Sequence, residues 1–190
     1  MTYKLPIETA RLTLRRYVAS DYDDLLRLQS NPDVTRFLLY DPKTPEQVRV
    51  SLAGRMAEVG MDGPDQALTV AVILRETGRH LGEVTLFVEN FAHQGGELGF
   101  VFHPESHGHG YAAEASIELL RLGFEELGMH RIIGRLDAAN TSSAKLLQRL
   151  GMRQEALFVQ NEFLKGEWTD EAVFAMLRDE WMRRSSGTGS

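Results

Sequence analysis

Two glycines, Gly108 and Gly110, lie directly before a helical pattern that begins near Tyr111, and this arrangement is typical of an anion site. Glycine has no Cβ, so its backbone can bend sharply and approach a ligand closely. The first amides of a helix lack intrahelical partners, and the helix dipole adds partial positive charge there. The pattern therefore predicts a phosphate or pyrophosphate site. An ordinary loop before a helix has the same spacing, so spacing alone leaves both interpretations open.

Other ligand chemistries fit this loop less well. It lacks the Gly-x-x-x-x-Gly-Lys pattern of nucleotide-binding loops and the third glycine of a dinucleotide-binding turn. His107 and His109 could be a pair of metal ligands, but the motif contains no acidic or thiol partner, and two ligands do not make a metal site. We therefore expect no metal.

The composition limits the class of protein. With 190 residues, of which 43% are hydrophobic, the chain is long enough for one domain with a sizeable core. The net charge of -6 disfavours nucleic acid and favours a cationic partner such as an amine. The absence of cysteine excludes disulfides, thiolate metal sites and a cysteine nucleophile. No apolar run is long enough to span a membrane and the N-terminus has no secretory pattern, so we expect no membrane partner and a cytoplasmic location.

Hydrophobic periodicity predicts the elements that position the loop. Strands are expected at residues 11–17, 67–74, 81–88, 95–102, 131–136, 158–164 and 171–177. One helix should begin at Ser20 as N-cap and end before Asn31, and a second should run from a capping box of Thr44 and Gln47 to residue 60. A further helix should follow the glycine loop, with the apolar stripe Ala113, Ile117, Leu120, Phe124 and Leu127, and a short one should span 142–150.

The order of these elements indicates a mixed α/β sheet. Strands 67–74 and 81–88 should form a hairpin. Strand 95–102, the helix after the loop and strand 131–136 form a crossover unit, so the two strands should run parallel with the loop at the carboxyl end of the first. We expect one domain over residues 1–184, and a disordered tail over the small, polar residues 185–190.

Three motifs, in this order, resemble the GCN5-related N-acetyltransferase (GNAT) superfamily over nearly the whole chain. They are Glu97-Leu98-Gly99, His107-Gly108-His109-Gly110-Tyr111-Ala112, and DAANTSS at 137–143 running to Leu150-Gly151-Met152. The segments at 7–15, 168–170 and 180–181 resemble the branch that acetylates the N-termini of ribosomal proteins. The resemblance implies an α/β fold whose mixed, mostly antiparallel sheet has a splayed parallel strand pair and flanking helices. It also implies an acetyl-CoA-dependent N-acetyltransferase.

The resemblance also implies which residues bind the coenzyme. The family's loop of Gln or Arg, two residues, Gly, one residue, and Gly or Ala matches His107, Gly110 and Ala112, with histidine replacing the usual Gln or Arg. Backbone amides of the loop would hold the pyrophosphate, and the pantetheine arm would pair with the edge of strand 95–102. The residues implied are Val101, Phe102, His107, Gly108, His109, Gly110, Tyr111, Ala112, Ala113, Asn140 and Ser143. Val101 and Phe102 could equally be core residues, and Asn140 a helix cap.

Acetyl transfer requires a neutral amine, yet an α-amino group titrates near ~7.7 to 8 and a lysine near ~10.4. The family often uses a glutamate on the strand before the loop, which implies Glu97 as the base, with Glu83 as the alternative. A backbone N–H near Val101 would stabilise the oxyanion. Many relatives have a tyrosine acid seven residues after the asparagine, but that position is Leu147, which leaves Ser143 to donate a hydrogen bond to the leaving sulfur.

The implied acceptor is a primary amine, first a protein or peptide N-terminus and next a small molecule such as a polyamine, an aminoglycoside or an amino acid. Tyr40, Phe163 and Trp168 could line its entrance or belong to the core. The remaining histidines form no recognisable constellation. The alternative of another class is a non-catalytic acyl-CoA-binding module, and a homodimer is compatible with the sequence.

Overall fold

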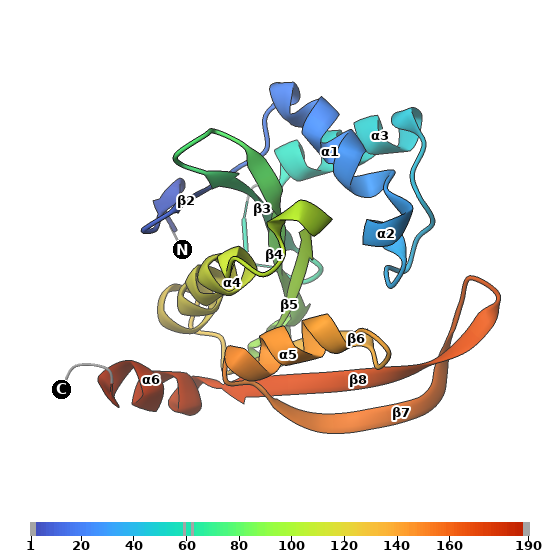
Figure 1. Cartoon of the computed structure of the whole chain (residues 1–190). Helices are drawn as coiled ribbons and strands as arrows, with labels where there is room; N and C mark the ends of the chain where they lie inside the picture. The colour runs from blue at the N-terminus through green and yellow to red at the C-terminus, as the bar shows by residue number, and fades with distance from the viewer. Residues whose placement is uncertain (1–2, 59, 62, 188–190) are drawn as a thin grey trace.

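The described residues form one eight-stranded sheet with helices on both faces (Figure 1). The computed structural model describes residues 3–58, 60–61 and 63–187, with the backbone alone for 185–187. The strand order is β1-β2-β3-β4-β5-β6-β8-β7. The strands are β1 (Ile7–Glu8), β2 (Leu12–Arg15), β3 (Ala67–Leu74), β4 (His80–Asn90), β5 (Gly95–Phe102), β6 (Arg131–Asp137), β7 (Arg153–Leu164) and β8 (Glu167–Leu177). The helices are α1 (Tyr22–Gln29), α2 (Pro32–Thr35), α3 (Pro45–Ala57), α4 (Tyr111–Arg121), α5 (Thr141–Arg149) and α6 (Arg178–Gly187).

The predicted parallel pair is confirmed, and it is splayed. Strands β5 and β6 pair in parallel, whereas the other pairs among the described strands are antiparallel. Their pairing covers Gly95, Gly96 and Glu97 of β5, although β5 continues to Phe102. Beyond Glu97, the side of β5 that faces away from β4 therefore has backbone groups without a strand partner.

Each face of the sheet has its own apolar core, because side chains alternate along a strand. On β5, Leu98 and Phe102 belong to the larger core, which includes side chains of α4, α5 and α6. Val101 packs against the smaller core, which is built around Leu25 and Leu28 of α1 with side chains of α3. Since Glu97 is four residues before Val101, its side chain lies on the face that α1 and α3 cover.

The capping box of α3 is confirmed. The Gln47 amide donates to the Thr44 hydroxyl at 3.3 Å, and the Thr44 amide donates to the Gln47 side chain at 2.8 Å. The prediction of Ser20 as an N-cap is wrong, because residues Ala19–Asp21 form a 3₁₀ turn and α1 begins at Tyr22. The carboxylate of Asp21, the residue before α1, makes no capping bond to that helix; it binds Arg15 at 2.7 Å and accepts a hydrogen bond from the Val18 amide at 2.8 Å.

The predicted apolar stripe of the helix after the glycine loop packs against the larger core except at Ile117, which is 40% exposed. The buried face also includes Ala115, Ser116 and Leu119, which the stripe did not contain. A π-helical segment, Leu122–Glu126, continues α4 and carries Phe124 into the core. Elements β1, α2 and α6 were not predicted. Helix α6 includes residues 185–187 of the predicted disordered tail, and residues 188–190 lie outside the described residues.

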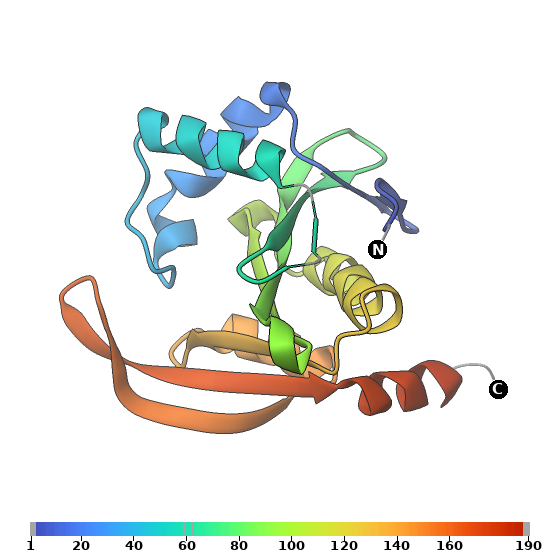
Figure 2. The same ribbon diagram turned by 180° about the vertical axis from the view of Figure 1, so that it is seen from behind.

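The β7–β8 hairpin is long and bends toward α2, as both views show (Figures 1 and 2). The register of the pair shifts between Phe158 and Glu162, which leaves extra residues on β7. Inside this bulge Gln160 has a φ of 52°, and its amide donates to the Asp170 carboxylate at 2.8 Å. Because a β-bulge bends its strand and increases the local twist, this irregularity directs the tip of the hairpin toward α2.

Candidate active site

The glycine loop presents free backbone donors to open space. Gly108 and Gly110 have φ values of 79° and 80°, a conformation that favours glycine. Helix α4 begins its hydrogen bonding with the Glu114 amide, which donates to the Gly110 carbonyl at 3.1 Å, so the amides of residues 110–113 precede the hydrogen-bonded helix. No side chain among the described residues caps this end, and a Cβ at Gly108 would meet no atom within 4 Å. The loop therefore fits the pyrophosphate of a coenzyme.

The two histidines of the loop have different surroundings. His107 is exposed, and its amide donates to the Pro104 carbonyl at 3.1 Å, so that amide is already used within the protein. His109 is also exposed, and its ring stacks on Tyr111 with centroids 5.4 Å apart. Ala112 and Ala113 are partly buried against the larger core. The described residues contain no group of three or more His, Asp or Glu side chains that could hold a metal ion.

Val101 and Phe102 are both core residues, as one interpretation of the sequence expects, and they lie on opposite faces of β5. Val101 is partly buried against the smaller core, and Phe102 is 7% exposed in the larger one. Their strand has no β6 partner at this point, so the same residues can be core residues and can offer a free backbone edge. This free edge begins after Glu97 on β5 and ends where the glycine loop follows the strand. It fits the amides of a pantetheine arm, which could pair with it as an added strand does.

Asn140 caps helix α5. Its side-chain oxygen accepts hydrogen bonds from the Ser143 amide at 3.1 Å and from the Ser142 hydroxyl at 2.9 Å. The partly buried Ser143 hydroxyl has no hydrogen-bond partner among the described residues, so it is available to a ligand. Leu147 is 1% exposed, and its Cδ1 lies 2.8 Å from the point that a Cβ on Gly134 would occupy. Helix α5 therefore packs tightly on β6 at Leu147, the position at which the family resemblance implies a tyrosine.

Glu97 is a partly buried carboxylate in a mixed electrostatic environment. Its Oε2 lies 3.2 Å from Nε of Arg135, which also donates to Glu89 at 2.9 Å. Burial is the largest effect and raises the pKa of Glu97 above its ordinary value; Arg135 opposes this, and the carboxylates of Glu89, Glu171 and Glu162 add to it. A raised pKa makes a carboxylate a stronger proton acceptor, as a general base requires.

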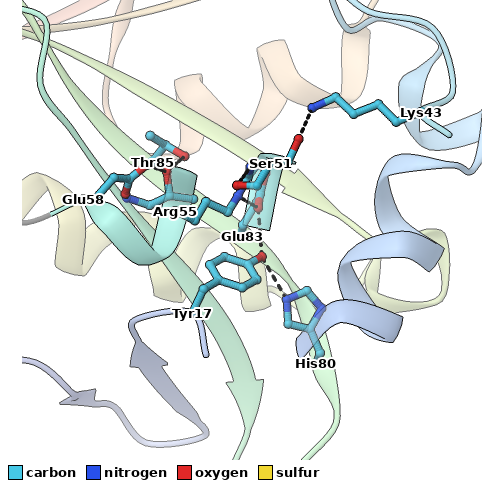
Figure 3. Close-up of polar contacts among 9 residues, drawn as sticks. Tyr17, Lys43, Ser51, Arg55, Glu58, His80, Glu83 and Thr85 are labelled. Atoms are coloured by element: carbon cyan, nitrogen blue, oxygen red, sulfur yellow. Dashed lines mark hydrogen bonds and ion pairs between the residues drawn. The ribbon is translucent and has the colours of Figure 1, made fainter. Parts of the chain in front are cut away.

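Glu83, the alternative base, belongs to a buried polar network on β4 (Figure 3). Its carboxylate accepts hydrogen bonds from the Tyr17 hydroxyl at 2.8 Å and from Nε of Arg55 at 2.8 Å, and it also pairs with the second nitrogen of that guanidinium. Burial raises the pKa of Tyr17, and the adjacent Glu83 charge raises it further. Glu83 is 4% exposed with its oxygens occupied, so Glu97 has the more available carboxylate.

A cleft of about 850 Å³ lies between α2 with its following loop and the β7–β8 hairpin. Its described lining residues are Pro32, Thr35, Arg36, Phe37, Asp41, Pro42, Asp137, Ala138, Ala139, Leu164, Lys165, Glu167, Trp168, Thr169 and Asp170. Trp168 is thus at the cleft, and Phe163 packs on it edge to face with centroids 5.3 Å apart. Tyr40 is not one of the described lining residues; burial raises its pKa to about 12.

The charge of this cleft favours a cation. Among its described lining residues, acidic side chains outnumber basic ones: Asp41, Asp137, Glu167 and Asp170 against Arg36 and Lys165. Lys165 donates to the carbonyls of Thr35 and, at 3.4 Å, Arg36, so the backbone of α2 holds its ammonium. Glu97 is not one of the described residues that line the cleft. Its partner Arg135, however, is only two residues before Asp137, which does line the cleft.

The fold and the site together define a class of enzyme. A family model described as "Acetyltransferase (GNAT) domain" matches residues 11–153, and the chain belongs to this family. It is an acetyl-CoA-dependent N-acetyltransferase with a GNAT fold. No helix in the described part of the chain has both the length and the apolar character needed to cross a membrane.

Relatives cover nearly the whole chain. The uncharacterized N-acetyltransferase YnaD of Bacillus subtilis is 31% identical over 175 residues, which cover 92% of this chain and 98% of the relative. The crystal structure of a GNAT-family acetyltransferase from Bacillus anthracis has a TM-score of 0.81 at 29% identity and covers 92% of this chain and 99% of its own. The spermidine N(1)-acetyltransferase of Vibrio cholerae is 26% identical over 105 residues, 55% of this chain and 61% of the relative. These comparisons do not support the ribosomal-protein branch in particular.

Three side chains at the site were not predicted: Arg11 at the glycine loop, Arg135 beside Glu97 and Lys165 at the cleft. Each joins segments that are distant in sequence, and Lys165 and Thr35 are 130 residues apart. Arg11 does lie in a segment that resembles the family, yet no spacing rule connects it to the loop.

Proposed function

We propose that the chain transfers the acetyl group of acetyl-CoA to a primary amine that enters the cleft between α2 and the β7–β8 hairpin. The observation that carries the proposal is the continuity of the free edge of β5 with the uncapped amides of residues 110–113. A coenzyme lying along both would bring its thioester toward Glu97, whose partner Arg135 is two residues before the cleft residue Asp137. When bound, it supplies the activated acetyl group.

The chain itself provides a proton acceptor, a hydrogen-bond donor for the oxyanion and a donor for the leaving sulfur. Glu97 accepts a proton from the acceptor ammonium, directly or through water, because its raised pKa makes it a better base than an exposed glutamate. A backbone N–H on the edge near Val101 donates to the developing oxyanion. Ser143 donates a hydrogen bond to the departing sulfur, and positioning of the two substrates supplies much of the rate.

The acceptor we favour is a small cationic amine. The cleft has a surplus of carboxylates, and a relative that aligns with about half of this chain is named a spermidine acetyltransferase. Carboxylates attract the ammonium groups of such a molecule and reject anionic competitors. A protein or peptide N-terminus remains the second candidate from the sequence, and the cytoplasmic location also remains a sequence prediction.

An amine panel with acetyl-CoA tests the proposal. The panel contains polyamines, aminoglycosides, amino acids and peptides with varied first residues, and the release of free thiol is measured. We expect turnover with polyamines above that with peptides. The variant Glu97→Gln should lower kcat by about 10²- to 10⁴-fold without changing the affinity for acetyl-CoA.

The matched control is Glu76→Gln, which removes an exposed carboxylate in the turn between β3 and β4 and should leave kcat unchanged. Tight binding of acetyl-CoA without thiol release for any amine would overturn the proposed function. Turnover with peptides alone would replace the small-molecule acceptor by a protein N-terminus.

A further inference from the structure

We infer that Arg11, in the turn between β1 and β2, positions the glycine loop and supplies the cationic side chain for the diphosphate of the coenzyme. The inference rests on the proposed function, because it takes the loop to be the diphosphate site. Between residues 104 and 113 the sequence has no lysine or arginine, and histidine occupies the first position of the loop motif. A dianionic group at this loop would therefore meet no permanent side-chain charge from the loop itself.

Arg11 first binds the helix that follows the loop. Its Nε donates to Glu114 Oε2 at 2.7 Å, a second guanidinium nitrogen lies 2.7 Å from the same oxygen, and its backbone amide donates to Oε1 at 3.0 Å. The Thr9 hydroxyl donates to Oε1 as well, at 2.6 Å. The N-terminal segment thus surrounds one carboxylate in the first turn of α4 with donors, although these residues are more than 100 positions apart.

Arg11 also binds the loop directly. Its third nitrogen donates to the His109 carbonyl at 2.9 Å, and its guanidinium carbon lies 4.6 Å from the centre of the Tyr111 ring. A Cβ placed on Gly110 would lie 3.6 Å from a terminal nitrogen of Arg11. The guanidinium therefore contacts the residues on both sides of Gly110. At 46% exposure the side chain also has a solvent-accessible surface that an anion can approach.

The charge of Glu114 explains why this contact affects an anionic ligand. Glu114 is in the first turn of α4, where a carboxylate competes with any bound anion for the positive end of the helix. Arg11 neutralises that carboxylate and holds it against the N-terminal segment. Without Arg11, Glu114 would repel the diphosphate, and the His109 carbonyl would lose the donor that fixes the loop. Arg11 therefore favours the diphosphate because its charge cancels that of Glu114 and because its hydrogen bond to the His109 carbonyl holds the loop in place.

A coenzyme fragment separates this function from a purely structural one, because pantetheine lacks the diphosphate that CoA has. Isothermal titration measures Kd for CoA and for pantetheine with Arg11→Met and Arg11→Lys. We expect Arg11→Met to weaken CoA binding by about 10- to 100-fold, the effect of losing one charge-assisted contact, and to change pantetheine binding less than about twofold. The Kd of Arg11→Lys for CoA should lie between those of the unaltered protein and Arg11→Met, because lysine keeps the charge but lacks the planar guanidinium.

Two further variants sharpen the test. Arg75→Met removes an arginine that binds Glu8 at 2.9 Å and the Thr9 carbonyl at 2.8 Å, so it loosens the same N-terminal segment without touching the glycine loop. It should leave the CoA affinity unchanged. Adding Glu114→Gln to Arg11→Met should restore part of the CoA affinity, since it removes the repulsion.

Equal weakening of CoA and pantetheine by both Arg11 variants, or the same CoA loss in Arg75→Met, would overturn the inference and leave Arg11 as an anchor of the fold. Thermal unfolding of each variant without ligand shows whether it is folded. If Arg11→Met is not folded, the Kd values of Arg11→Lys for CoA and pantetheine decide the outcome, because this variant retains the charge. Failure of the unaltered protein to bind CoA would count against the proposed function, and is distinct from any result that concerns Arg11 alone.

Discussion

Glu97 lies between one cation and several carboxylates, so its protonation should control the pH dependence of acetyl transfer. Burial raises its pKa above the ordinary glutamate value, and Arg135 limits the rise. Because the proposed base, Glu97, must be ionised to accept a proton, kcat/KM should fall as the pH decreases through this raised pKa. Removing the opposing cation with Arg135→Gln should move the acidic limb of the pH–rate profile to higher pH, and Glu97→Gln should abolish that limb.

The control for Arg135→Gln is Arg131→Gln, four residues earlier on β6. Arg131 pairs with Glu155 rather than with Glu97, so its removal deletes the same charge from the same strand without exposing the base. Its pH–rate profile should match that of the unaltered protein. An acidic limb that stays in place in Arg135→Gln and persists in Glu97→Gln would show that another group is the base.

The hydrogen-bonded pairs that the sequence predicted are close together along the chain, and the pairs that it missed are far apart. Thr44 and Gln47 are three residues apart, and their spacing fixes the capping box before any tertiary contact forms. Arg55 reaches Glu83 across 28 residues, and Arg11 reaches Glu114 across 103. No local pattern specifies such pairs, because the folded sheet brings their backbones together. The loop amides and Glu97 were predictable as candidate site residues. The arginines that change their electrostatic surroundings, Arg11 at the loop and Arg135 at Glu97, were not.

Lys165 joins the β7–β8 hairpin to α2 at the cleft that we propose for the acceptor. This residue has a φ of 52° at the hairpin turn, and its ammonium binds the carbonyls of Thr35 and Arg36 at the C-terminal end of α2. The Thr35 carbonyl also accepts from the Leu38 amide at 2.9 Å. Removing the ammonium with Lys165→Met should free the tip. We expect amide hydrogen exchange to become about tenfold faster across residues 158–170 and 32–37, as measured by mass spectrometry, because local opening then costs one charged hydrogen bond less.

The same variant should raise KM for the amine and leave the Kd of acetyl-CoA unchanged, since the glycine loop is on another part of the sheet. Lys145→Met, at an exposed position of α5, is the control and should leave the exchange of both segments unaltered. Unchanged exchange in Lys165→Met would show that the bulge alone holds the hairpin in place.

Elements with a strong local pattern were predicted, and those shaped by the rest of the fold were not. Strand β3 was predicted with its observed bounds because it is a compact apolar run that ends at turn residues. Strand β5 was also predicted with its observed bounds. Strand β7 begins at Arg153, earlier than predicted, since almost all of its side chains are exposed and alternation gives no signal there. Helix α2 has four residues, too few for periodicity, and its last carbonyl is bound by a lysine from the hairpin.

At the scale of the whole molecule, a buried polar network lies beside the smaller core, and its histidine ties the stability of the fold to pH. The Tyr17 hydroxyl donates its one hydrogen to Glu83, so Nε2 of His80, 3.2 Å from that hydroxyl, must be the donor toward it. Nδ1 of His80 is buried without a partner among the described residues. A second proton would have to occupy this nitrogen. Burial, and next the adjacent His103, therefore lower the pKa of His80 to about 4, against smaller opposing effects of Asp24, Glu83 and Asp21.

This shift predicts how the free energy of unfolding depends on pH. An unfolded histidine titrates near 6.5, so between that value and about 4 the unfolded chain binds more protons than the folded one, and stability decreases as the pH falls. The contribution of His80 is complete above pH 6.5 and is lost by about pH 4, which amounts to about 3 kcal/mol. His80→Gln, which keeps a donor for Tyr17 and cannot titrate, should lose correspondingly less stability over this range in urea unfolding. The control is His93→Gln, which replaces an exposed histidine and should behave like the unaltered protein. If the free energy of unfolding of His80→Gln kept the same dependence on pH, the acid sensitivity would belong to other groups, such as His103, whose pKa is also lowered by burial.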